Sequence, residues 1–71
     1  MIILGLPQKR AQTAELLEGL VLEGITFKVE EVKGINITIS SDGDEEQSLS
    51  LLKPFLKSEL GPAIYFNIKI A

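Results

Sequence analysis

The chain has 71 residues, of which 45% are hydrophobic and 24% charged, and a formal net charge of −3. This length allows one small domain with one core, spanning residues 1–71, and the absence of cysteine and histidine excludes a disulfide or a structural zinc site of those ligands. Stability must come from packing, and a mean hydropathy of +0.25 favours association that hides apolar surface.

The charge pattern disfavours a nucleic-acid partner. The seven Lys and Arg residues are scattered among ten Asp and Glu, whereas binding to phosphates requires clustered cations. No apolar run reaches the roughly 18 to 20 residues of a membrane span, and the first residues lack a basic segment followed by a long apolar one. The sequence therefore predicts a cytoplasmic protein that does not bind membranes.

The first third of the chain predicts a strand and a helix. Residues 1–6 are continuously apolar, as in a covered central strand. Pro7 fits the first turn of a helix, and apolar residues then recur at helical spacing over residues 8–23. Gly24 suits the left-handed cap that ends many helices.

The next segment alternates with period two and predicts a hairpin. Residues 25–32 place Ile25, Phe27 and Val29 on one face, and Glu30-Glu31 breaks the alternation, which predicts a bulge or an exposed strand end. Gly34 provides a reversal, and residues 35–40 then form a half-buried strand.

The last third predicts a second helix and a fourth strand. An acidic turn, residues 41–46, precedes apolar residues at helical spacing up to Leu60, and acids there complement the helix dipole. Pro54 either kinks this helix or begins its main part. Gly61-Pro62 ends it, and residues 63–70 alternate again.

This element order predicts an α+β fold. Two right-handed strand–helix–strand crossovers give a four-stranded antiparallel sheet, order 4-1-3-2, with both helices on one face, which is the ferredoxin-like βαββαβ split unit. The expected core contains the first strand, the apolar stripes of both helices, and Ile25, Phe27, Val29, Ile35, Ile37, Ile39, Ile64, Phe66 and Ile68. Ile3 is expected to lie bare on the open face of the sheet.

The connection after the first strand is a candidate anion-binding site. Backbone N–H groups after Gly5, with Lys9 and Arg10 beside them at a helix start, are suited to a small anionic ligand, although both cations also suit a solvated surface. The element order and Gly5 are similar to ACT-like regulatory domains, a resemblance that implies small-ligand binding at this loop and pairing between domains.

The same segment resembles the phosphate-binding loop of acylphosphatases. That resemblance implies that Arg10 binds phosphate and Asn36 orients water, but the family's spacing and second glycine are missing. Catalysis usually recruits histidine or cysteine, and the chain has neither, so we expect no enzymatic activity. Helix capping explains the acids at Asp42 and residues 44–46 without a metal, and no cofactor is expected.

The sequence thus favours a non-catalytic module that binds another protein or forms a homodimer. Two dimer modes are open: stacked open faces around Ile3 and Tyr65, or pairing between the edges of the second strands. The candidate interface residues are Ile3, Lys28, Tyr65 and Asn67.

Overall fold

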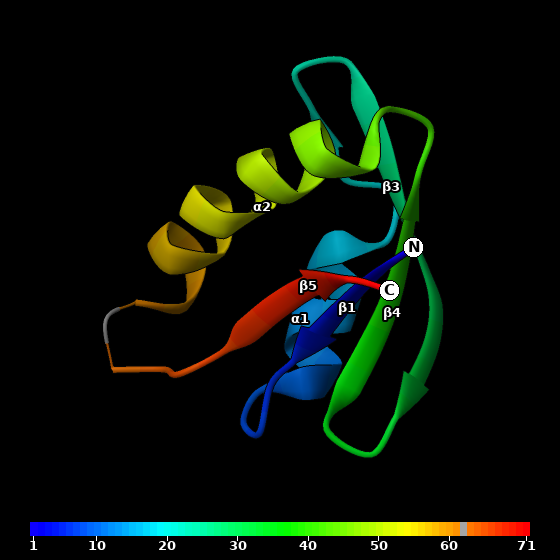
Figure 1. Ribbon diagram of the computed structural model, residues 1–71. Coiled ribbons are helices and arrows are strands. Elements are labelled where there is room, and N and C mark those ends of the chain that lie inside the picture. Colours follow the sequence, from blue (N-terminus) through cyan, green and yellow to red (C-terminus); the bar gives the residue numbers. More distant parts are fainter. Residues whose placement is uncertain (62) are drawn as a thin grey trace.

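The computed structural model describes residues 1–61 and 63–71, and Pro62 lies outside the described residues. The described residues form five strands and two helices (Figure 1): β1 (Ile2–Gly5), α1 (Arg10–Leu17), β2 (Val21–Leu22), β3 (Ile25–Lys33), β4 (Asn36–Ser41), α2 (Glu45–Leu60) and β5 (Asn67–Ile70).

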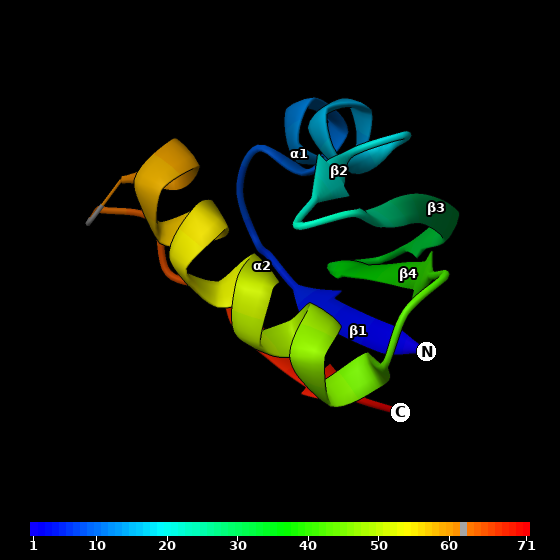
Figure 2. The same ribbon diagram turned by 90° about the horizontal axis from the view of Figure 1, so that it is seen from above.

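The strands form one antiparallel sheet in the order β2-β3-β4-β1-β5. The predicted four-stranded ferredoxin-like sheet is therefore wrong. The strands expected from the sequence are neighbours in the order β5, β1, β4 and β3, but β2 adds a fifth strand beyond β3. The sheet also curves into a half-barrel, with α1 near its β2 end and α2 beside β5 (Figure 2).

The fifth strand arises because the first helix is shorter than the sequence predicts. It ends at Leu17 rather than at residue 23, and the chain returns as the β2–β3 hairpin. The two loop residues of this hairpin, Glu23 and Gly24, both have positive φ, 50° and 81°, as a type I′ turn requires. Gly24 therefore serves a hairpin rather than a helix cap, and helical periodicity alone does not separate these two uses of glycine.

The segment that follows α1 covers the outer edge of β3. The N–H of Gly19 donates to the carbonyl of Phe27 at 3.0 Å, and the N–H of Phe27 donates to the carbonyl of Leu20 at 2.7 Å. The carboxylate of Glu18 accepts from the N–H of Val29 at 2.9 Å. This half of β3 is thus not a free edge. It is not exposed for the predicted edge-to-edge pairing of this strand between two copies.

The hairpin between β3 and β4 confirms the predicted bulge. The register shifts between Val29 and Glu31, so Glu30 has no partner opposite it. Ile37 on β4 is buried as expected, whereas Ile35 is 51% exposed. The core prediction is wrong at Ile35 because this residue lies in the turn, between the paired residues Lys33 and Asn36.

A single core fills the concave side of the sheet and includes residues from both helices. Val29, Ile64, Phe66 and Ile68, predicted to be buried, are only half-buried and pack against its rim. The buried apolar residues are Ile2, Leu4, Leu6, Leu17, Ile25, Phe27, Ile37, Ile39, Leu52 and Leu56.

Helix α2 runs without interruption from Glu45 to Leu60, with Pro54 inside it. Its first half is helical, so Pro54 does not begin the main helix. The side chain of Asp44 caps its N-terminus by accepting from the N–H of Gln47 at 3.0 Å.

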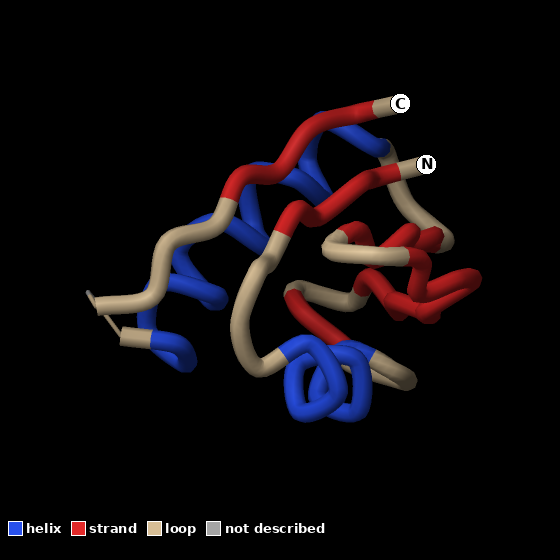
Figure 3. The backbone as a smooth tube through the Cα atoms, turned by 90° about the horizontal axis from the view of Figure 1, so that it is seen from below, coloured by secondary structure: helices blue, strands red, loops and turns tan. Residues whose placement is uncertain are grey.

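The last strand is shorter than predicted, because only residues 67–70 pair with β1. The two chain ends lie side by side (Figure 3), and the N–H of Ala71 donates to the carbonyl of Met1 at 2.8 Å.

Candidate functional site

The predicted anion-binding residues are spread along the connection from β1 to α1. Lys9 is in the left-handed region with φ 59° and gives the helix no side-chain cap. Arg10 turns back and donates through Nη1 to the carbonyl of Pro7 at 3.1 Å. The N–H of Leu6 donates to the carbonyl of Ile35 at 2.8 Å, so this amide is not available to a ligand. Anion binding by Gly5, Lys9 and Arg10 stays a prediction.

Gly5 has a packing role in this structure. A Cβ built on Gly5 would lie 2.8 Å from the side-chain oxygen of Asn67, which is opposite it on β5. The missing side chain thus allows Asn67 to lie across β1. The position that resembles the ACT-like loop glycine is explained by this close approach between neighbouring strands.

A small hollow of about 130 Å³ lies between α1 and the end of α2, lined by Lys9, Thr13 and Glu59 among others. The hydroxyl of Thr13 is buried and has no hydrogen-bond partner among the described residues. Lys9 and Glu59 contribute opposite charges to the lining, so the hollow offers no consistent charge to an ionic ligand.

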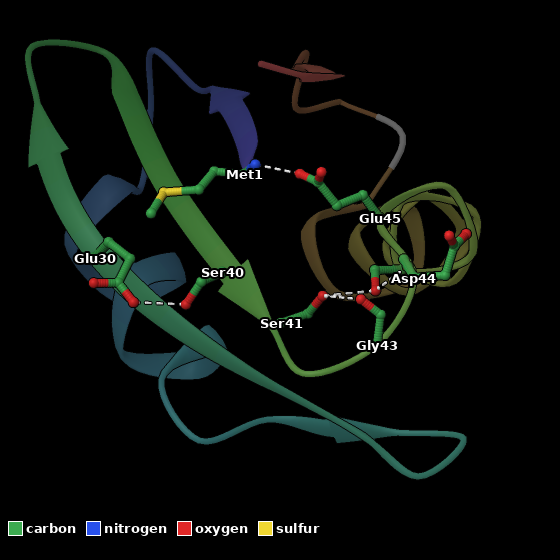
Figure 4. A network of polar contacts seen from close by, with 8 residues as sticks. Met1, Glu30, Ser40, Ser41, Gly43, Asp44 and Glu45 are labelled. Carbon is green, nitrogen blue, oxygen red and sulfur yellow. Dashed lines mark hydrogen bonds and ion pairs between the residues drawn. The ribbon is translucent and has the colours of Figure 1, made fainter.

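The acidic turn before α2 is engaged in local contacts (Figure 4). The carboxylate of Asp42 accepts from the N–H of Thr26 at 2.9 Å, Asp44 caps α2, and Glu45 forms an ion pair with the amino group of Met1. In the described part of the chain, no three acidic residues come together as possible metal ligands. Helix capping, as predicted, accounts for Asp44.

The serines near this turn are also used structurally. The buried Ser48 hydroxyl donates to the carbonyl of Asp44 at 2.7 Å and lies 2.8 Å from the hydroxyl of Ser41. On the convex face, Ser40 donates to the carboxylate of Glu30 at 2.6 Å (Figure 4). These contacts satisfy the hydroxyl groups and join neighbouring elements.

The four predicted interface residues come from β1, β3, β5 and the segment before β5. Ile3 is half-buried, with Thr38 and Lys69 as its paired neighbours on either side. Lys28 is on β3, which is separated from β1 by β4. Tyr65 is 73% exposed, but it precedes β5 instead of belonging to it. The paired neighbours of Ile3 are thus polar, and the stacked dimer around Ile3 and Tyr65 stays a prediction.

The two outer strands of the sheet are β2 and β5, and β5, with four residues, is longer than β2, with two. Strand β5 is last in the sheet order and, among residues 1–61 and 63–71, pairs only with β1. Since Ala71 donates to Met1 and hydrogen-bonded pairs alternate in an antiparallel ladder, the N–H groups of Asn67 and Lys69 also face β1. The N–H and C=O groups of Ile68 and Ile70 therefore point outward.

A groove of about 1010 Å³ lies between the C-terminal half of α2 and the chain leading into β5. In Figure 1 the C-terminal half of α2 is yellow to orange, and the chain that leads into the red strand β5 is orange. Only two of its described lining residues are charged, and both are lysines. The lining residues are Lys53, Pro54, Lys57, Gly61, Ala63, Ile64, Tyr65, Phe66, Asn67 and Ile68.

Sequence reasoning missed both the β5 edge and the groove. The alternation of residues 63–70 identified the strand, but a pattern does not reveal which side of a strand is left unpaired. The spacing of Lys53 and Lys57, one helical turn apart, was the available signal for the groove.

Comparison with known proteins does not assign the chain. No protein-family model matches it, and no match is found among the curated proteins or the solved structures. Neither helix in residues 1–61 or 63–71 combines the length and apolarity needed to cross a membrane.

Proposed function

We propose that the protein is a non-catalytic cytoplasmic module that self-associates by pairing the β5 edges of two copies. The supporting observation is the unpaired outer edge of β5, whose outward backbone groups belong to Ile68 and Ile70. Exposed strand edges are templates for pairing with another chain. Pairing here would join the sheets of two copies into one, a mode of association known as strand addition.

One register of an antiparallel β5 pair fits the side chains better than the others. With Ile68 opposite Ile68 of the second copy, Phe66 lies opposite Ile70 and Asn67 lies opposite Lys69. The apolar residues then share one face and the polar residues share the other. A shift that places Ile68 opposite Ile70 would bring the two Lys69 side chains together, and directly opposed like charges are destabilising.

The exposed state of Ile70 supports this register. Ile70 is 38% exposed and Phe66 is half-buried in the single chain. Their contact across the interface would remove apolar surface from water, at about 25 cal/mol per Å². A contact of so few residues belongs to the weak, transient class of interfaces, so we expect association at high protein concentration.

The test compares two substitutions at one edge position. Ile70→Ala and Ile70→Pro both remove the isoleucine side chain, but only proline removes the outward N–H. In the symmetric dimer this N–H would donate one hydrogen bond from each copy, two in total. Two hydrogen bonds contribute about 2 kcal/mol, so Ile70→Pro should weaken association by about thirtyfold relative to Ile70→Ala.

Sedimentation equilibrium is the appropriate measurement. Concentrations up to about 1 mM detect association as weak as about −4 kcal/mol. Equal association constants for the two Ile70 variants, each with the far-ultraviolet circular dichroism of the unaltered protein, would refute pairing at this edge. A monomer for the unaltered protein over the whole range would refute self-association.

A further inference from the structure

The groove between α2 and the chain before β5 has the composition of a binding site for an amphiphilic ligand. Its apolar side chains include Pro54, Ile64, Phe66 and Ile68, and its volume of about 1010 Å³ is at the upper end of small-molecule pockets. In the single chain Ile64, Phe66 and Ile68 are half-buried, so their remaining surface is accessible from the groove.

The charge of the groove opposes that of the whole protein. The chain has ten acidic and seven basic residues, for a net charge of −3, yet the only charged residues among the described lining are Lys53 and Lys57. They are four residues apart on α2, so they lie on one side of the helix. Both lysines are exposed, and no ion pair joins either to an acidic residue in the described part of the chain.

From this arrangement we infer that the groove binds a small amphiphilic anion, with an apolar body against Ile64, Phe66 and Ile68 and an anionic head group near Lys53 and Lys57. The polar groups of Tyr65 and Asn67 lie in the same lining and are suited to hydrogen bonds with that head group. In such sites a small number of polar groups in a mainly apolar wall fix the orientation of the ligand and provide specificity.

This inference goes beyond self-association and does not depend on it. The groove is formed within one copy, whereas strand pairing uses the outward backbone groups of Ile68 and Ile70 and a contact of Phe66 with Ile70 of the other copy. Phe66 and Ile68 belong to both surfaces, but the Ile70→Pro substitution weakens pairing without changing any residue of the groove lining. Binding can therefore be measured in the Ile70→Pro variant as well as in the unaltered protein, and a failure of either proposal is seen separately.

The probe is decanoate, titrated below its micellar concentration and followed through the backbone amide signals. The signals of Ala63, Ile64, Phe66 and Ile68 should shift and saturate, while those of α1 stay unchanged. Decyltrimethylammonium, with the same apolar chain and the opposite charge, should bind at least tenfold more weakly because the lysines repel it.

The decisive variants change only exposed charges. The double substitution Lys53→Gln/Lys57→Gln should raise the dissociation constant for decanoate about tenfold, the effect expected from two partly exposed charge pairs. The matched control, Lys28→Gln/Lys33→Gln, makes the same change in net charge on β3, away from the groove, and should leave binding within about twofold.

Two results would overturn the inference. One is the absence of saturable shifts at residues 63–68 with decanoate. The other is equal binding of decanoate and decyltrimethylammonium, or equal losses in the two lysine pairs, because either result would show that the lysines of the groove do not select the ligand.

Discussion

Two isoleucines on one hairpin give the sharpest test of the packing. Alternation along residues 35–40 assigns Ile35 and Ile37 to the same buried face. In the structure Ile37 has 0% of its surface exposed and Ile35 has 51%. Removal of a fully buried isoleucine side chain in Ile37→Ala should cost about 2 to 5 kcal/mol, whereas Ile35→Ala should cost less than about 1 kcal/mol, as for other exposed sites.

The assay is urea unfolding followed by circular dichroism at a fixed, low protein concentration, so that association does not contribute. A chain of 71 residues has a free energy of unfolding of roughly 4 to 10 kcal/mol, so Ile37→Ala should remove a large part of it. With a urea m-value of about 1 kcal/mol/M, the midpoint should fall by about 2 M or more. Equal losses for Ile35→Ala and Ile37→Ala would refute the turn position assigned to Ile35.

Substitutions at four further positions test local contacts and backbone conformation. Asp44→Ala should lower the free energy of unfolding by about 1 kcal/mol through loss of the N-terminal cap of α2, measured by urea unfolding. Glu18→Ala should speed hydrogen exchange at the amide of Val29, which loses its acceptor; unchanged protection would contradict that contact. Gly24→Ala should cost about 1 to 2 kcal/mol because its φ is 81°, and Gly24→Asn should cost less, since asparagine is favoured in such turns. Thr13→Val should leave stability unchanged or raise it, because it removes a buried hydroxyl that has no partner among the described residues; a loss above about 1 kcal/mol would contradict the assignment.

Alternation with a period of two located β3 and β4, but it overestimated the last strand, since only residues 67–70 of the alternating segment 63–70 form β5. The residues of β3 and β4, the bulge near Glu30 and the cap at the start of α2 all follow from local patterns. Helical spacing over residues 8–23 was misleading because Leu20, which continues the spacing after Leu17, packs against the core from the segment that follows α1. A glycine at positive φ ends a helix or turns a hairpin, and the choice depends on the contacts of β3 with Gly19 and Leu20.

The candidate sites were less accessible to prediction. Gly5, Lys9 and Arg10 are adjacent in sequence, but the amide after Gly5 pairs with Ile35, which is distant along the chain. The groove brings together Lys53 and Phe66 through the turn between α2 and β5. Such a surface depends on how two elements diverge in space, and neither periodicity nor composition contains that information.

Backbone contacts between two copies test the central claim most directly. A sample that mixes isotope-labelled and unlabelled protein at high concentration reports only contacts between copies in an isotope-filtered NOE experiment. Pairing at the β5 edge predicts contacts from Ile68 to Ile68, and from Phe66 to Ile70, of the other copy. Contacts between copies that involve other strands, or no such contacts in a sample shown to be dimeric, would contradict the account.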